Sequence, residues 1–303
     1  MRIVAIALAL AAASTLNWAQ PAHAGTASAA KIAQMDHISI EAVGNPKGSA
    51  VFLIPGLSMS RENWRSTADR IAGAHRVYLV QLNGFGGSAA GTNVEPGLMQ
   101  GVVEDLHQFI RANHIQNAQI VGHSLGGTLA LLMARSHPDD VRGIMLVDAL
   151  PWVALIAAPP TVTTAQIEPM AAAMRDKFKA TYGQPMNQDQ AKATIAALAL
   201  KPASRTAALQ WMQGADPRVS GEAFYEDMML DMRADLPGIA TPITLLYPHP
   251  DNGPAKDAAD ALYHSVYAKT PHMTYVPVDD SGHFIMLDQP AAFDAALDTF
   301  LAN

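Results

Sequence analysis

One serine of this chain is well placed to act as a nucleophile. Ser124 lies between Gly122 and Gly126 in a G-x-S-x-G pattern, after the apolar run 118–121 and before 125–135, which has helical spacing. This pattern is typical of a sharp turn from a strand into a helix, which holds the serine hydroxyl clear of the sheet. Glycine is needed beside the serine because neighbouring backbone passes close there. We predict that Ser124 attacks a carbonyl carbon.

A serine hydroxyl is a weak nucleophile near neutral pH, so it needs a base and an acid that orients the base. Among the 11 histidines, His283 follows a glycine in the loop between a strand-like run at 273–278 and a helical run that begins near Phe293. In proteins with this elbow, the chain order is serine, acid, histidine. We predict that His283 is the general base.

Two aspartates fit the position of the acid. Asp251 lies in the loop 248–253, after the strand-like run 241–247, and is the preferred candidate. Asp148 directly follows the apolar run 143–147 and is the alternative acid. Each carboxylate would stand just past the end of a strand, where it could accept the Nδ1 proton of the histidine. The sequence Asp-Asn-Gly after position 250 is also a strong turn signal, so the choice stays open here.

An oxyanion hole requires two backbone N–H groups aimed at the developing negative charge. One is expected from Leu125, the residue after the nucleophile, and the other from a loop after an early strand. The strand-like run 50–54 is followed by such a loop, in which Gly56 lets the backbone turn closely and Pro55 has no N–H to offer. We therefore predict that the N–H of Leu57 is the second donor.

Taken together, these motifs resemble those of the α/β-hydrolase superfamily. The resemblance covers nearly all of the chain outside its N-terminus and a central insertion, and it also favours Asp251, nine positions after Pro242. It implies an α/β fold with a mostly parallel sheet, helices on both faces and a helical cap insertion. The matching segments are Ile54-Pro55-Gly56-Leu57, Asn83-Gly84-Phe85-Gly86-Gly87-Ser88, Gly122-His123-Ser124-Leu125-Gly126-Gly127 and Gly282-His283-Phe284 with Gln289-Pro290.

The chain also departs from this family pattern. Gln81 and Asn83 stand where many relatives have aspartate and proline, and Pro55 replaces the usual histidine. The serine at position 124 argues against dehalogenase and epoxide hydrolase activity, because such members of the superfamily use an aspartate there. The resemblance leaves esterases, lipases, peptidases, C–C bond hydrolases and perhydrolases, because one fold hosts many activities.

Strand-like and helical runs alternate along most of the chain, which predicts a parallel sheet with a ligand site at the carboxyl ends of its strands. The alternation breaks near position 150 and resumes near 237. We therefore divide the chain into an α/β core of residues 25–150 and 237–303 and a methionine-rich helical cap of residues 151–236. Helices in the cap are predicted near 164–182, 188–200, 204–212 and 221–232.

Composition narrows the possible partners and chemistry. The 303 residues carry a formal net charge of -7 and no cluster of lysine and arginine, which argues against nucleic acid and anionic membranes as partners. The chain has no cysteine, which excludes thiol catalysis and cysteine-ligated metals. The serine mechanism needs no cofactor and no metal.

The N-terminus has the pattern of a secretory signal peptide. Arg2 precedes the apolar run 3–13, and Ala22-His23-Ala24 forms a small-x-small cleavage site. We predict a signal peptide of residues 1–24, cleavage after Ala24 and a periplasmic or secreted protein. The apolar run is too short to cross a membrane, so the mature chain is not expected to insert stably into one.

The sequence thus predicts a carboxylesterase-like serine hydrolase for small-molecule esters with small to medium acyl or alkyl groups. Two alternatives remain. An aminopeptidase of the same fold would use Glu222 and Glu226 to bind the substrate ammonium. A non-catalytic binding protein would keep the fold only for its pocket. No oligomeric state is predicted.

Overall fold

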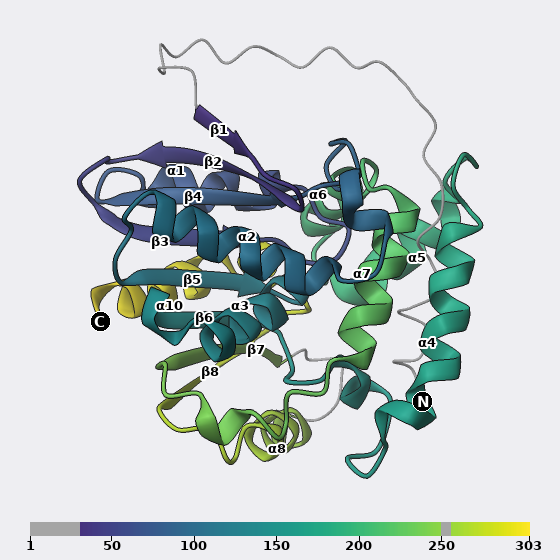
Figure 1. Cartoon of the computed structure of the whole chain (residues 1–303). Helices are drawn as coiled ribbons and strands as arrows, with labels where there is room; N and C mark the ends of the chain where they lie inside the picture. Colours follow the sequence, from purple (N-terminus) through teal and green to yellow (C-terminus); the bar gives the residue numbers. More distant parts are fainter. Residues whose placement is uncertain (1–30, 250–255) are drawn as a thin grey trace.

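The computed structural model describes residues 31–249 and 256–303, which form one eight-stranded sheet in the order β1-β2-β4-β3-β5-β6-β7-β8 (Figure 1). β1 and β2 run antiparallel to their neighbours, whereas all pairs from β4 to β8 are parallel. The strands are β1 (Lys31–Gln34), β2 (Ile38–Gly44), β3 (Ser49–Ile54), β4 (His75–Leu82), β5 (Ala118–His123), β6 (Val141–Val147), β7 (Ile243–His249) and β8 (Met273–Asp279).

Helices cover both faces of this sheet. The α-helices are α1 (Arg65–Ile71), α2 (Leu98–Ala112), α3 (Leu125–Ser136), α4 (Thr164–Lys179), α5 (Gln188–Leu198), α6 (Pro202–Met212), α7 (Pro217–Met229), α8 (Lys256–Val266), α9 (Ile285–Asp288) and α10 (Pro290–Ala302). Short 3₁₀ segments accompany them, including η2 (Arg61–Trp64) directly before α1.

Alternation along the buried strands produces two hydrophobic layers. Successive residues of a strand point to opposite faces, so Phe52 and Ile54 pack with α2, α3 and α8, while Val51 and Leu53 pack with α1 and α10. Apolar residues on both faces explain why the parallel strands are continuous hydrophobic runs. The predicted fold class, a mostly parallel sheet between two helical layers, is confirmed.

The insertion between β6 and β7 holds four α-helices, α4 to α7, which lie together to the right of the sheet in Figure 1. Their bounds lie within a few residues of the predicted helical segments. Buried residues of α4 and α7 join the layer that contains α2 and α3, and those of α5 and α6 join the opposite layer. The inserted helices therefore contact the core on both sides of the sheet.

The strand-like runs predicted at 50–54, 118–121, 143–147, 241–247 and 273–278 lie within about two residues of β3, β5, β6, β7 and β8, but β1 was not predicted. No strand was predicted before position 38, and the structure pairs Lys31–Gln34 with β2. The predicted signal peptide, residues 1–24, lies outside the described residues. In the described part of the chain, no helix is long and apolar enough to span a membrane.

Candidate active site

Ser124 stands at the turn between β5 and α3 in a strained backbone conformation. Its φ of 53° and ψ of -121° lie in a region that non-glycine residues rarely adopt. A Cβ added at Gly122 would lie 2.1 Å from the carbonyl oxygen of Gly126, and one added at Gly126 would lie 2.3 Å from that of Ile54. Only glycine fits either position, so the predicted strand–turn–helix elbow is confirmed.

The loop after β3 lies directly against this elbow. A Cβ added at Gly56 would lie 2.9 Å from Nδ1 of His123 and 3.2 Å from Cβ of Ser124. Leu57 follows at once, and Leu125 is the first residue of α3. Within the described residues, neither of their N–H groups has a hydrogen-bond acceptor. Both predicted oxyanion donors are therefore unoccupied and belong to segments that meet at Ser124.

His283 lies in the loop between β8 and α9, and the inserted helices help to hold it. Its N–H donates to the carbonyl oxygen of Leu198, at the end of α5, over 2.7 Å. The carboxylate of Asp288, which is fully buried, accepts from the N–H of Gly282 at 2.9 Å and from that of Leu200 at 3.0 Å. The histidine loop and the segment after α5 are thus fixed to one carboxylate.

The imidazole of His283 is paired with Asp148, at the carboxyl end of β6. Nδ1 of His283 lies 2.6 Å from Oδ2 of Asp148. Asp148 has a left-handed φ of 49°, and its N–H donates to the carbonyl oxygen of Leu246 in β7 at 2.8 Å. The side chains of His283 and Asp148 are 21% and 13% exposed, so the pair reaches the surface but is largely shielded from water.

Asp251, the acid preferred from the sequence, lies outside the described residues. The structure therefore brings the alternative acid, Asp148, into contact with His283, and it does not test Asp251. His123, the residue directly before Ser124, lies against His283. Its Nε2 lies 3.0 Å from the carbonyl oxygen of His283, and the two imidazole rings are 4.5 Å apart.

His123 is buried and uncharged. Burial lowers the pKa of His123 well below its ordinary value, and the charge of the nearby His283 lowers it further. Its Nε2–H donates to the His283 carbonyl oxygen, and within the described residues its Nδ1 has no partner. This neutral side chain connects the turn at Ser124 to the loop that contains His283.

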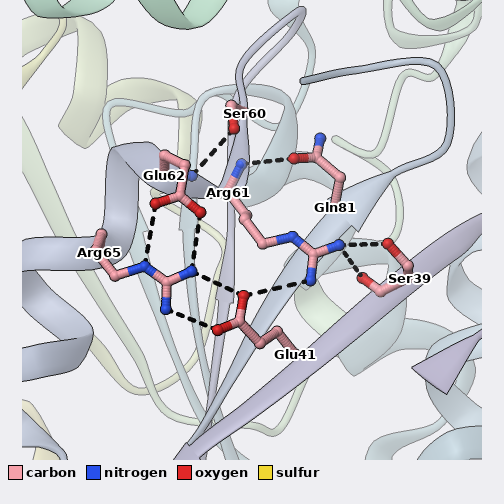
Figure 2. Close-up of polar contacts among 7 residues, drawn as sticks. All are labelled: Ser39, Glu41, Ser60, Arg61, Glu62, Arg65 and Gln81. Atoms are coloured by element: carbon pink, nitrogen blue, oxygen red, sulfur yellow. Dashed lines mark hydrogen bonds and ion pairs between the residues drawn. The ribbon is translucent and has the colours of Figure 1, made fainter. Parts of the chain in front are cut away.

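Figure 2 shows a polar network that holds the chain directly after the loop containing Leu57. Oε1 of Gln81 accepts from the N–H of Arg61 at 2.8 Å. Nε2 of Gln81 also donates to the carbonyl oxygen of Met59 at 3.4 Å. The guanidinium of Arg61 donates to the backbone and hydroxyl oxygens of Ser39. Gln81, which departs from the family pattern, therefore anchors the end of the loop after β3.

Both acidic residues considered as ammonium ligands are already occupied. Glu222 is almost fully buried, and its Oε2 lies 2.6 Å from Nζ of Lys179 on α4. Glu226 accepts from three successive N–H groups at the start of α2, those of residues 97, 98 and 99, at 2.5, 2.9 and 2.8 Å. These two carboxylates connect helices to one another, so they are not free to bind a substrate ammonium.

One cluster of possible metal ligands lies among the described residues. His107, His137 and Asp140 have ligand atoms within 4.8 Å of one another. Nδ1 of His107 lies 2.6 Å from Oδ2 of Asp140, and Nε2 of His137 lies 3.2 Å from Oε1 of Glu104. The rings are stacked, with centroids 3.9 Å apart and 9° between their planes. Because each nitrogen lone pair lies in its ring plane, two parallel rings cannot both point to one ion. The cluster instead forms two histidine–carboxylate hydrogen bonds.

Sequence reasoning missed three residues that support the site: Asp288, Gln81 as an anchor, and Tyr263. Tyr263 lies on α8, and its hydroxyl donates to Oδ1 of Asp148. A polar residue in a helical stretch gives no signal of a contact 115 positions away. Asp288 does lie between His283 and Pro290, inside a segment that had been recognised.

The chain is similar to several known hydrolases. Epoxide hydrolase 3 of Xenopus tropicalis is 32% identical over 108 residues, which span 36% of this chain and 29% of that protein. A pimeloyl-[acyl-carrier protein] methyl ester esterase of Vibrio atlanticus is 27% identical over 254 residues, which span 78% of this chain and 92% of that protein. A thermophilic esterase from Thermogutta terrifontis has a similar fold, with a TM-score of 0.72 and 21% identity over 90% of this chain and 98% of that one.

The sequence profile of the alpha/beta hydrolase family matches residues 51–296. This range begins in β3, contains the elbow and the inserted helices, and ends in α10. The glycine-flanked turn at Ser124, the strands β4 to β8 and the histidine loop after β8 all lie within it. The chain therefore belongs to the alpha/beta hydrolase family.

Proposed function

We propose that this hydrolase cleaves carboxylic esters of small to medium acyl or alkyl groups through a covalent acyl-enzyme. The observation that carries the proposal is the pairing of His283 with Asp148 beside the strained elbow of Ser124. A serine at such a turn needs only a base and an orienting acid to become a nucleophile. The proposed substrate class, an ester, is supported by the similarity of this chain, over most of its length, to a methyl ester esterase.

In this mechanism, Ser124 loses its proton to Nε2 of His283 and attacks the ester carbonyl carbon. Asp148 accepts the Nδ1 proton as a hydrogen bond, which fixes the ring and stabilises its cation. The imidazolium then protonates the leaving alcohol, and the acyl group stays on the serine oxygen. Water, deprotonated by the same histidine, attacks the acyl-enzyme and releases the acid. The proposal thus takes Asp148 as the acid in place of Asp251.

The N–H groups of Leu57 and Leu125 are the proposed oxyanion donors. Two supports favour them: both groups lack a protein acceptor within the described residues, and Gly56 lies against Ser124. Donors fixed before the reaction stabilise the negative charge without reorganising, which is a large contribution in this type of catalysis. The anchoring of residues 59–61 by Gln81 supports such a fixed loop.

We further propose that the inserted helices cap the site and form the acyl pocket. In support, Leu198 accepts from the N–H of His283, and the hydroxyl of Ser220 on α7 lies 2.8 Å from that of Ser58 beside Leu57. The cap would thus contact both the histidine loop and the oxyanion loop. An apolar, methionine-rich insertion favours small or medium hydrocarbon groups over sugars or polyanions.

Export remains part of the proposal. The signal pattern before Gly25 supports cleavage after Ala24 and action on esters in the periplasm or the medium. The intact mass of the protein purified from periplasmic and culture fractions tests this. A chain that begins at Gly25 is expected, and a full-length chain in the cell interior would contradict export.

The residues that suggested an aminopeptidase are not free to bind a substrate ammonium, because Glu222 is bound to Lys179 and Glu226 to the start of α2.

The decisive experiment is hydrolysis of p-nitrophenyl acetate, butyrate, octanoate and palmitate by residues 25–303, beside the Ser124→Ala variant. We expect turnover that falls at least about a thousandfold in the variant. Turnover that survives the substitution would refute the serine mechanism, and absence of both turnover and fluorophosphonate labelling would favour a binding protein.

A further inference from the structure

Both oxygens of the Asp148 carboxylate are occupied by side chains from other elements. Oδ2 lies 2.6 Å from Nδ1 of His283, and Oδ1 accepts a hydrogen bond from the hydroxyl of Tyr263 on α8. The phenol is 7% exposed, and its ring stacks at a tilt on that of Tyr247, with centroids 4.6 Å apart. A rigid, buried aromatic ring therefore holds the oxygen that faces away from the histidine.

The direction of this hydrogen bond is determined by the surroundings. Burial raises the pKa of the Tyr263 phenol well above its ordinary value, and the charge of Asp148 raises it further. The phenol thus keeps its proton and donates, and the carboxylate accepts. Among the described residues, the titratable groups that face Asp148 are His283 after β8, Tyr263 on α8 and Tyr267 just after α8, with His123 beyond His283.

We propose that Tyr263 is a positioning residue for the reaction, acting on His283 through Asp148. The inference rests on the proposed function with Asp148 as the acid. A carboxylate can rotate about its Cβ–Cγ bond, and a donor fixed on Oδ1 leaves Oδ2 directed at Nδ1. The same donor withdraws charge from the carboxylate, which limits how strongly the carboxylate stabilises the protonated imidazole. Tyr263 would therefore set both the orientation and the basicity of the general base.

The chain provides a matched control for the loss of a buried phenol. Tyr267 lies four positions further along, is fully buried, and donates to the carbonyl oxygen of Ala149 at 3.0 Å. Tyr263→Phe and Tyr267→Phe each remove one hydroxyl from the same layer of the core. Only the first removes a donor from the carboxylate, so a difference between the two variants isolates that contact.

The test compares kcat, KM and the pH profile of kcat/KM for p-nitrophenyl butyrate in these two variants and in the wild-type enzyme. For Tyr263→Phe we expect kcat to fall about tenfold or more, with KM nearly unchanged, because a hydrogen bond to a charged group is lost. We also expect the acidic limb of kcat/KM to move to higher pH, because the freed carboxylate stabilises the imidazolium more strongly. The inference is overturned if kcat stays within threefold of the Tyr267→Phe value, or if the limb is not displaced upward relative to that control.

Circular dichroism and thermal unfolding establish that each variant is folded. If Tyr263→Phe does not fold, 3-fluorotyrosine placed at position 263 by codon suppression retains the ring and the hydroxyl and makes the phenol a stronger donor. The acidic limb should then move to lower pH, and an unmoved limb would overturn the inference. This second substitution changes the hydrogen bond without emptying the core.

Failure of the proposed function gives a different pattern. If wild-type enzyme does not hydrolyse the ester, the second-order rate of fluorophosphonate labelling of Ser124 replaces kcat in the same comparison, because labelling needs the triad and not a particular ester. If Asp148→Asn remains active while Asp251→Asn does not, the acid is Asp251, and the role given to Tyr263 is refuted. If the Ser124→Ala variant remains active, the serine mechanism itself is refuted.

Discussion

Nδ1 of His283 and Oδ2 of Asp148 lie 2.6 Å apart although 135 positions separate them in the chain. Asp148 directly follows β6, and the loop after β8 brings His283 to the same edge of the sheet. Because β7 lies between these two strands, the pairing crosses one full strand. It requires the turn at Asp148, where the left-handed φ of 49° directs the chain out of the sheet.

Asp148→Asn is expected to lower kcat about a thousandfold or more, because an amide favours the wrong tautomer of His283 and does not stabilise its cation. Asp251→Asn is expected to stay within about threefold of wild type. The measurement is kcat for p-nitrophenyl butyrate in both variants. The reverse result, with Asp251→Asn inactive and Asp148→Asn active, would place the acid after β7 as the sequence first indicated.

A second prediction concerns Gly56, which holds the oxyanion loop against the elbow. In Gly56→Ala the new Cβ would meet Nδ1 of His123 at 2.9 Å and Cβ of Ser124 at 3.2 Å, so the loop carrying Leu57 must move away. We expect kcat to fall about tenfold to a hundredfold, because one oxyanion donor is displaced. Gly73→Ala is the control, since an added Cβ there meets nothing within 4 Å. Equal kcat in the two variants would show that the Leu57 N–H is not used.

The sequence predicted the elements whose signals are local. The elbow could be recognised because Gly122 and Gly126 are required by backbone contacts within a few residues, and the strands because both their faces are apolar. β1 was missed because the polar segment Lys31–Gln34 becomes a strand only by pairing with β2. The acid stayed ambiguous for a related reason, since two carboxylates follow neighbouring strands and only the fold decides which one reaches His283.

Glu226 carries a prediction on stability. Its carboxylate accepts from the three N–H groups at residues 97–99, at the start of α2, where Gly97 provides no side chain to cap them. Glu226→Ala should lower the free energy of unfolding by about 1 to 3 kcal/mol, because these donors and the positive end of the helix dipole lose their partner. Urea unfolding measures this, with the exposed Glu95→Ala as control. Loss of amide hydrolysis alone, without loss of stability, would instead revive the aminopeptidase reading.

The buried carboxyl of Asp227 is expected to make the free energy of unfolding depend on pH. This residue of α7 is buried, its Oδ1 has no partner within the described residues, and its other interaction is a hydrogen bond with the Thr128 side chain on α3. Burial raises the pKa of Asp227 to about 7 from an ordinary value of 3.8. The folded protein therefore keeps a proton that the unfolded chain releases, so this stabilisation is complete below about pH 4 and is lost as pH rises through 7.

Asp227→Asn keeps a neutral side chain of the same shape at every pH. Between pH 5 and 8, the free energy of unfolding of the wild type should fall relative to this variant by about 2 to 3 kcal/mol. Urea unfolding at several pH values measures the difference, and the exposed Asp139→Asn should run parallel to wild type. Parallel curves for Asp227→Asn and wild type would mean that the buried carboxyl is already ionised at pH 5. A growing difference would mean that Asp227, which lies between α7 and α3, destabilises the folded protein when it loses its proton.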